Sequence, residues 1–447
     1  MDKKIRNSQN INFVLLSSFA LAPLLGSTIL IFILFLVLYT VKNLTFNKQW
    51  FTAYLPIRII GLAFISYFCC FTILELIHSE NLQTATRALG KIFPIFVIGL
   101  LGLLLEIKKF PIRYLDIGNA AILGIYLTTS LALFFKFLFP VISINGYDFV
   151  TNDLDIHGRL TMFSGNALPF GTMFITVSFL TLAGIAEKSP LNRLIAVSAL
   201  IVGILTVVSW NQSRGPMLSA IPLLFITFCF ITMQFKLHKK ILSYLILTLL
   251  IITLSVVVYS FKGSIIHFLY FSPIESLGPT TSFDNYWYAY RTVLEGKPYD
   301  MSVYTRLVMY SASIKTFFVS PFIGHGLDGM GLAILPFLNS EELLGHASWA
   351  EITYRHFHNV FINHSLAGGL IGLVALATLL ASPLITLYYN ANEKNMDTIF
   401  CSLIIITSMI FNGMTNVLFF QDLLGAFFTI LILINGIASY NKKIIKF

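Results

Sequence analysis

The chain has 447 residues, of which 57% are hydrophobic and only 11% are charged, and its mean hydropathy is +0.82. Water cannot solvate most of such a chain, which excludes a soluble globular protein and predicts a polytopic membrane protein. The net charge of +9 does not indicate nucleic-acid binding, because the lysines and arginines are spread over many short loops instead of one face.

Long runs rich in Phe, Leu and Ile recur along the chain between short polar breaks. A helix needs about 20 apolar residues to cross a bilayer, and runs without strict alternation favour helices over a β-barrel. We therefore expect an all-α fold with about twelve transmembrane helices. They are expected near residues 10–24, 27–41, 55–77, 89–106, 114–137, 162–185, 192–210, 215–234, 240–261, 357–387, 398–416 and 420–438.

The distribution of basic residues predicts the orientation. With the N-terminus inside, the short outside segments hold only Arg87, Lys91, Arg159 and Arg214, whereas the inside segments hold seventeen lysines and arginines. Basic loops stay cytoplasmic, so both termini are expected there. The first apolar stretch continues to about Val41, which favours an uncleaved helical hairpin over a signal peptide.

The same topology leaves one long segment, residues 262–356, on the outside. It mixes aromatic residues with charges of both signs, and its prolines, among them Pro273, Pro279, Pro298 and Pro321, divide it into short helices and turns. We expect one membrane domain, built from nine helices in residues 1–261 and three in residues 357–447, with residues 262–356 as an outside loop subdomain.

A tight outside turn between two expected spans contains Arg214. Pro216 suits the beginning of the following helix, and Gly215 lets the backbone approach a ligand closely. An arginine at a helix N-terminus predicts an anion site. The alternative is an arginine whose head group reaches the lipid boundary.

Arg306 lies farther along, in the outside segment. The sequence from Tyr304 to Ser320 predicts an amphipathic helix that Pro321 and a glycine turn end. Taken alone, Arg306 is typical of a surface salt-bridge partner.

The stretch Arg355-His356-Phe357-His358-Asn359 places polar groups at the beginning of an apolar run. His358 is expected in the first turn of the tenth span, where the positive end of the helix dipole favours the neutral imidazole that a general base requires. The alternative is a histidine that caps the helix or contacts a lipid head group. The neighbouring polar residues favour a functional role.

Metal-binding motifs are missing from the sequence. There is no His-Glu-x-x-His and no paired cysteine motif, and His358 and His364 would not share a helical face. We expect no metal and no cofactor, so arginines would have to neutralise any phosphate.

Together these motifs give the chain a resemblance to the O-antigen ligase family, over the topology of nearly its whole length. His358 and Asn359, followed after nine residues by Gly369 and Gly372, meet the most specific pattern of the family. Three weaker likenesses occur in the family order: Gly158-Arg159-Leu160 before the sixth span, Gln212-Ser213-Arg214, and Arg306 with Ser320-Pro321-Phe322.

The resemblance implies a glycosyltransferase of lipopolysaccharide biosynthesis in the bacterial inner membrane, with its active site facing the periplasm. It implies transfer of a glycan from undecaprenyl pyrophosphate to the lipid A core, with inversion and without a metal. Arg214 and Arg306 would hold the pyrophosphate, and His358 would take the proton of the acceptor hydroxyl. Asn359 and the Gly369/Gly372 pair would shape the helix that presents His358.

Several alternatives stay open. His356 is the alternative base, Arg291 is the alternative to Arg306, and Arg159 and Arg355 are supporting candidates. O-antigen polymerases share the superfamily and extend the glycan on its lipid carrier. A lipid or sugar transporter is a third possibility, but transporters place ionisable residues near the midplane, whereas the candidates here gather at the outer rim.

Overall fold

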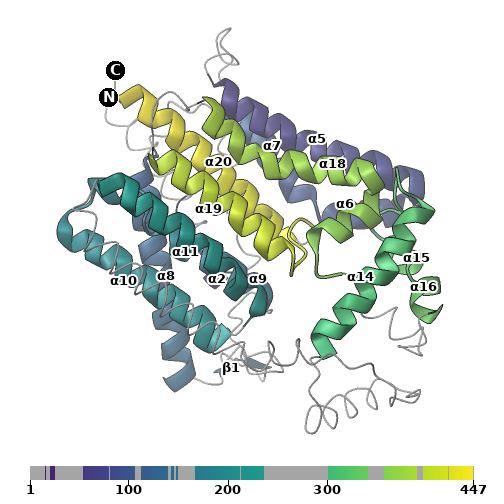
Figure 1. Cartoon of the computed structure of the whole chain (residues 1–447), viewed down its shortest axis with the longest axis horizontal. Helices are drawn as coiled ribbons and strands as arrows, with labels where there is room; N and C mark the ends of the chain where they lie inside the picture. Colours follow the sequence, from purple (N-terminus) through teal and green to yellow (C-terminus); the bar gives the residue numbers. More distant parts are fainter. Residues whose placement is uncertain are drawn as a thin grey trace.

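The computed structural model describes residues 16, 21–25, 54–79, 81–105, 112–138, 142–144, 147–149, 167–211, 213–235, 301–340, 357–389, 396–420 and 422–445. This part of the chain is mostly helical, and its long helices lie side by side (Figure 1). The long helices are α5 (Leu55–His78), α8 (Tyr114–Leu138), α10 (Pro190–Thr206), α11 (Arg214–Phe235), α14 (Met301–Val319), α18 (Val360–Tyr389), α19 (Met396–Gly413) and α20 (Asp422–Ile445).

Shorter elements connect these helices. They are α2 (Ala22–Leu25), α6 (Leu82–Gly90), α7 (Phe93–Leu104), α9 (Ala167–Leu180), the 3-10 turn η4 (Ile185–Glu187), the π-helical turn η5 (Val207–Asn211), α15 (Met330–Ala333) and α16 (Leu335–Ser340). Strands β1 (Ile142–Ile144) and β2 (Tyr147–Phe149) form an antiparallel hairpin in which Ser143 pairs with Asp148. The hairpin lies in an expected outside loop and adds a short sheet to the predicted helical fold.

Seven described helices are long and apolar enough to cross a membrane, or eight if the bent pair α6 and α7 is one span. They confirm the spans expected near residues 55–77, 114–137, 192–210, 215–234, 357–387, 398–416 and 420–438. The expected spans at 27–41 and 240–261, and most of that at 10–24, lie outside the described residues. The described part of the expected outside loop is residues 301–340, with α14, α15 and α16.

Two expected spans have a different form. The span expected at residues 89–106 contains only the 12-residue helix α7, which is bent by 64° relative to the preceding α6. Pro94 lies in the first turn of α7, a position that suits proline, and so marks the beginning of a new helix. The span expected at 162–185 contains only the 14-residue helix α9, which a left-handed turn at Gly184 follows (φ 64°). Nearly all of α9 is buried by its neighbours.

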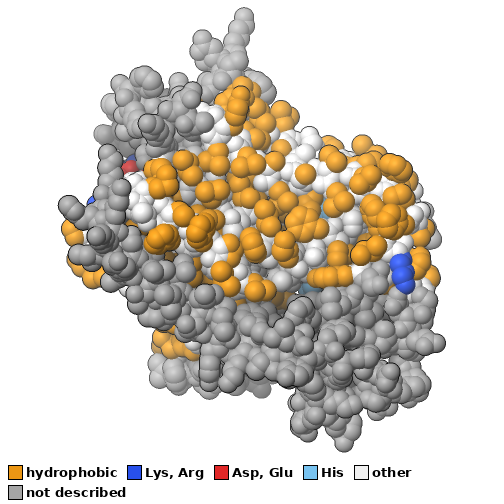
Figure 2. Space-filling view, in the orientation of Figure 1, with side chains coloured by type: hydrophobic (Ala, Val, Ile, Leu, Met, Phe, Trp, Pro, Cys, Tyr) orange, Lys and Arg blue, Asp and Glu red, His pale blue; other side chains and the backbone are white. Residues whose placement is uncertain are grey.

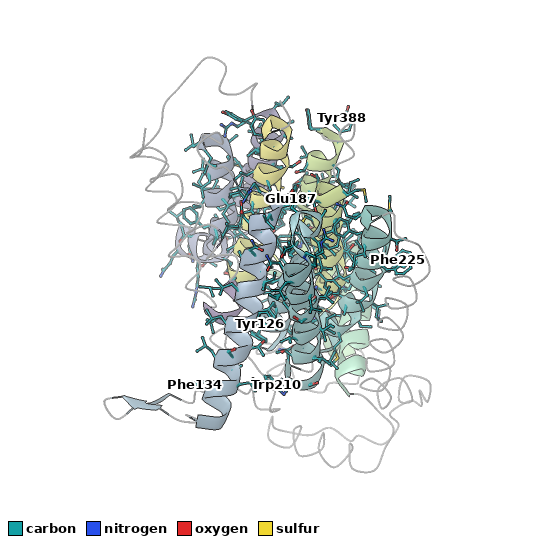
Figure 3. All side chains as sticks on the ribbon, turned by 90° about the vertical axis from the view of Figure 1, so that its left-hand side faces the viewer. Tyr126, Phe134, Glu187, Trp210, Phe225 and Tyr388 are labelled. Carbon is teal, nitrogen blue, oxygen red and sulfur yellow. The ribbon has the colours of Figure 1, made fainter. Side chains whose placement is uncertain are left out.

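Two ends of the bundle can be told apart. Glu187 and Tyr388 lie toward one end, and Trp210 and Phe134 lie toward the other (Figure 3). We call the first the Lys188 end, after the buried lysine next to Glu187. We call the second the His358 end, because the turn after Trp210 and the turn before α18 lie there together.

Helices α5 and α7 approach so closely that only glycine fits between them. A Cβ on Gly61 would lie 2.7 Å from the carbonyl oxygen of Gly99, which is the small-residue packing typical of membrane helices. Arg58, fully buried on α5, donates to the carbonyl oxygens of Gly102 (2.6 Å) and Leu105 (2.8 Å). This arginine therefore satisfies the last carbonyl groups of α7.

Apolar side chains cover most of the described part of the face seen in Figure 2. Several are largely exposed on the expected spans, such as Ile73, Leu123, Phe225 and Val374, and Phe225 projects from the side of the bundle in Figure 3. Exposed apolar side chains on long helices are stable in a bilayer but not in water.

Buried polar contacts close the Lys188 end. Asp397 on α19 accepts from the backbone N–H of Gly184 (3.1 Å), and Lys188 Nζ donates to the carbonyl oxygen of Thr181 (2.9 Å). Burial lowers the pKa of Lys188 from 10.5 to about 8, an effect that the charge of Asp397 partly opposes. The ammonium form of Lys188 is therefore less favourable in the folded protein than in the unfolded chain.

The lowered pKa predicts a pH dependence of stability. Below about pH 8 Lys188 is protonated in both the folded and the unfolded protein, and the buried charge destabilises the folded protein in full. Between pH 8 and 10.5 the folded state releases its proton first, so stability rises. Across this window we expect the melting temperature of the wild type to rise by a few degrees relative to Lys188→Met. Melting temperatures that change equally with pH in the two proteins would contradict this account.

Candidate active site

Three helices that carry candidate residues meet at one short segment, residues 413–416, at the His358 end. These helices are α11, which begins at Arg214, α14, which contains position 306, and α18, which follows His358. A Cβ on Gly215 would overlap Thr415 Oγ1, Tyr310 Oη donates to the carbonyl oxygen of Met414 (3.4 Å), and a Cβ on Gly413 would lie 2.6 Å from Val360 Cγ1. The fold thus gathers three elements that are far apart in sequence.

His358 has a left-handed backbone, with φ of 47°. This conformation is costly for a residue with a side chain and occurs preferentially at functional sites. Helix α18 begins at Val360, so His358 precedes the helix instead of occupying its first turn as expected. The half-buried side chain of His358 therefore lies in the turn that enters the helix.

Two asparagines hold this turn in place. Asn359 Oδ1 caps α18 by accepting from the N–H groups of Phe361 (2.9 Å) and Ile362 (3.2 Å). Buried Asn363 accepts from Phe357 N (3.1 Å) and donates to the carbonyl oxygen of Asn359 (2.8 Å). The residues on both sides of His358 are therefore bound to α18, which supports its left-handed backbone.

Helix α11 begins at Arg214, which was expected in the turn just before the helix, and Pro216 lies in its first turn as predicted. The expectation for Gly215 was wrong. The space beside its Cα is filled by the side chain of Thr415, so this glycine permits helix packing instead of ligand approach. The side chains of Arg214 and Arg306 lie outside the described part of the structure.

Helix α14 confirms the predicted helix around Arg306 and ends at Val319, just before Ser320-Pro321. Position 306 lies one helical turn before Tyr310, whose hydroxyl reaches the 413–416 segment. Residues at spacings of three and four, namely Met309, Ala312, Ser313 and Thr316, are buried. This stripe faces the bundle, and α14 packs beside α18 (Figure 1).

The turn after α14 docks onto a break in α18. Gly369 interrupts this helix with φ of 58° and ψ of −143°, which leaves backbone groups without partners inside the helix. The turn supplies the partners through four backbone bonds. They run from His325 N to Leu366 O (2.8 Å), Gly326 N to Ala367 O (2.9 Å), Leu370 N to Pro321 O (2.8 Å) and Ile371 N to Phe322 O (3.2 Å).

Glycine is required at this contact. A Cβ on Gly369 would overlap the carbonyl carbon of Phe322, and one on Gly372 would overlap the carbonyl oxygen of His364. The pair was expected to shape the helix that presents His358. Gly369 breaks this helix about three turns beyond His358 and admits the proline turn of the outer segment, whereas Gly372 lies against the backbone of α18 itself at His364.

Some candidates are not tested by this geometry, because Arg159, Arg291, Arg355 and His356 lie outside the described residues. His364, considered earlier only as a metal ligand, is fully buried. It contacts Tyr67 Oη (2.8 Å) and the carbonyl oxygen of Val360 (2.6 Å), and stacks on Phe420. These contacts give His364 a packing role.

The sequence interpretation missed three polar residues of this region. Asn363 holds the His358 turn, and Asn416 belongs to the segment at which the helices meet. Glu75, buried on α5, accepts from Leu327 N (2.7 Å) and from Ser79 Oγ (3.0 Å) and so fixes the end of the proline turn. These residues could have been found from the sequence as polar residues in or beside apolar runs, as in Asn412-Gly413-Met414-Thr415-Asn416.

The glycine at the break allows a test. We expect Gly369→Ala to lower the melting temperature by several degrees, because a positive φ with a strongly negative ψ is a glycine backbone that costs an alanine about 1–3 kcal/mol and the added Cβ overlaps Phe322. Gly90→Ala, where the Cβ meets nothing within 4 Å, is the matched control and should leave it unchanged. Equal melting temperatures for the two variants would contradict the docking role.

Comparison with known proteins gives one family. No curated protein matches the chain. A family model described as O-antigen ligase matches residues 196–377, a segment that includes Arg214, Arg306, His358 and the Gly369/Gly372 pair but ends before residues 413–416. This family implies a membrane enzyme that transfers glycosyl groups in the O-antigen pathway. The match covers residues 196–377, less than half of the chain, and over that segment it confirms the resemblance to the O-antigen ligase family read from the sequence.

Proposed function

We propose that this protein is an O-antigen ligase that moves a glycan from undecaprenyl pyrophosphate to a hydroxyl of the lipid A core. The acceptor oxygen attacks the anomeric carbon, and the bond from that carbon to the pyrophosphate oxygen breaks with inversion. His358 takes the proton of the acceptor hydroxyl, and the pyrophosphate leaves on its lipid with the bonding electron pair. The reaction needs no metal or cofactor.

One observation carries the proposal: the beginning of α11, helix α14 and the beginning of α18, two residues after His358, all contact residues 413–416. Two of these elements bring arginines, and the third brings a histidine. Guanidinium groups form strong bidentate bonds with phosphate oxygens and stabilise charge that develops on a leaving pyrophosphate. A base and an anion site around one segment suit glycosyl transfer.

The backbone of His358 supports its assignment as the base. A left-handed φ on a residue other than glycine persists only when its surroundings impose it, and here Asn359 and Asn363 bind the residues on both sides. A catalytic group held in this way loses little entropy when it reacts.

The site is proposed to face the periplasm at the inner membrane, with both termini in the cytoplasm. The basic residues Arg113, Lys188 and Arg193 lie at the opposite, Lys188 end, as the positive-inside rule requires of a cytoplasmic face. Donor and acceptor are both anchored in lipid, so a site where the bundle meets water suits both.

Purified protein with lipid-linked donor and lipid A core tests the catalytic roles. We expect His358→Ala to lower the transfer rate at least a hundredfold, within the usual contribution of a general base, and Arg214→Ala to lower it by a similar factor. Arg87→Ala, an exposed arginine of α6 at the same end, should retain activity. The rate should be unchanged in EDTA.

Full activity of His358→Ala would overturn the assignment of the base, and strict dependence on a divalent ion would overturn the role of the arginines in neutralising the pyrophosphate.

The lipopolysaccharide of a deletion strain distinguishes a ligase from a polymerase. Loss of a ligase leaves bare core and accumulated lipid-linked polymer. Core that carries a single repeat would instead identify a polymerase.

Asn363 gives a separate prediction as a positioning residue. Asn363→Ala should lower kcat roughly tenfold, because small displacements of a catalytic group are costly, while KM for the donor stays within twofold. Ser365→Ala is the matched control, since its hydroxyl bonds only its own helix at Ile362 O (2.9 Å). An increase of KM with unchanged kcat would contradict the positioning role.

A further inference from the structure

Two buried polar atoms at the His358 end have no hydrogen-bond partner. Ser213 is fully buried and Asn416 is 2% exposed, yet Ser213 Oγ and Asn416 Nδ2 bond to nothing. A buried polar group without a partner costs about 1–3 kcal/mol, so such groups are few in folded proteins and often have a functional role.

Ser213 immediately precedes α11. A serine in this position normally accepts from the backbone N–H two or three residues into the helix. Here the third helical residue is Pro216, which has no N–H. The usual capping bond to that position is therefore impossible, and the hydroxyl of Ser213 remains available at the positive end of the helix.

Asn416 follows α19 in the 413–416 segment. Its Oδ1 accepts from Val417 N at 2.8 Å, which fixes the orientation of the amide. The unused atom is Nδ2, which can only donate. A ligand that satisfies Asn416 must therefore present an acceptor oxygen.

The two residues belong to touching segments. Gly215, two residues after Ser213, packs against Thr415, the residue before Asn416. Buried threonine hydroxyls without partners also occur at Thr128, Thr129 and Thr227, but these lie inside α8 and α11 instead of at a helix beginning. Only the pair of Ser213 and Asn416 combines a helix N-terminus with two unused donors among the described residues.

We propose that Ser213 and Asn416 bind the diphosphate of the lipid-linked donor, next to Arg214. A diphosphate carries many acceptor oxygens and negative charge, which suits two neutral donors at the positive end of α11. This inference rests on the proposed function and adds two binding residues to it. Asn416 lies beyond the segment that matches the family model.

The test measures binding of undecaprenyl pyrophosphate to the purified full-length protein in detergent, with undecaprenyl phosphate as the comparison lipid. We expect Ser213→Ala and Asn416→Asp each to weaken binding of the diphosphate about tenfold, since each loses one hydrogen bond to a charged group. Asn416→Ala serves as a second variant at that position. Thr227→Val removes a buried, unpartnered hydroxyl in mid-helix and should leave the affinity unchanged.

The melting temperature measured without lipid distinguishes a binding role of Ser213 from a role in packing. Ser213→Ala removes a hydroxyl that has no partner, so its ligand-free melting temperature should equal or exceed that of the wild type. A lower melting temperature with unchanged affinity would make Ser213 a structural residue and overturn the inference.

The same binding measurements also distinguish a failure of this inference from a failure of the proposed function. If Arg214→Ala loses the diphosphate while either Ser213→Ala or both Asn416 variants keep wild-type affinity, the joint site is wrong and the proposed function stands. If the wild type binds the diphosphate no better than the monophosphate, both fall.

Discussion

The break in α18 is the contact on which the arrangement of the site depends. A helix interrupted at membrane depth leaves N–H and C=O groups that lipid cannot satisfy. The turn at residues 321–326 satisfies them with four backbone bonds, and Glu75 binds the N–H of Leu327 just beyond. Because these bonds tie the end of α14 to α18, they set where position 306 lies relative to the turn that holds His358.

A second constraint is the close approach of helices around residues 413–416. Gly215 and Gly413 allow contacts that any side chain would block. The same region keeps Ser213 Oγ and Asn416 Nδ2 buried without partners, at a cost to the stability of the folded protein. Proteins commonly retain such a cost where a ligand is bound, since optimising the fold alone would remove it.

Much of the helical fold was predictable because apolar length is a strong signal in a membrane. The bend between α6 and α7 and the shortness of α9 were not predicted, although Pro94 and Gly184 mark them in the sequence. Whether a proline bends a span or begins a new helix depends on the neighbouring helices. Arg58 was overlooked for a similar reason, since its partners are carbonyl groups of α7.

The sequence alone determined the membrane class, the main spans and the order of Arg214, Arg306 and the His358 motif, because composition and spacing are local properties. Only the tertiary structure decided that Gly369 breaks α18 to receive the proline turn, that His358 precedes its helix, and that Gly215 packs against Thr415. The first and the last of these features depend on contacts between segments more than 40 residues apart, and the second depends on side-chain bonds of Asn359 and Asn363 within the turn. A periodicity or motif within one segment does not indicate which distant segment will pack against it, because close packing depends on the shapes of all the helices together.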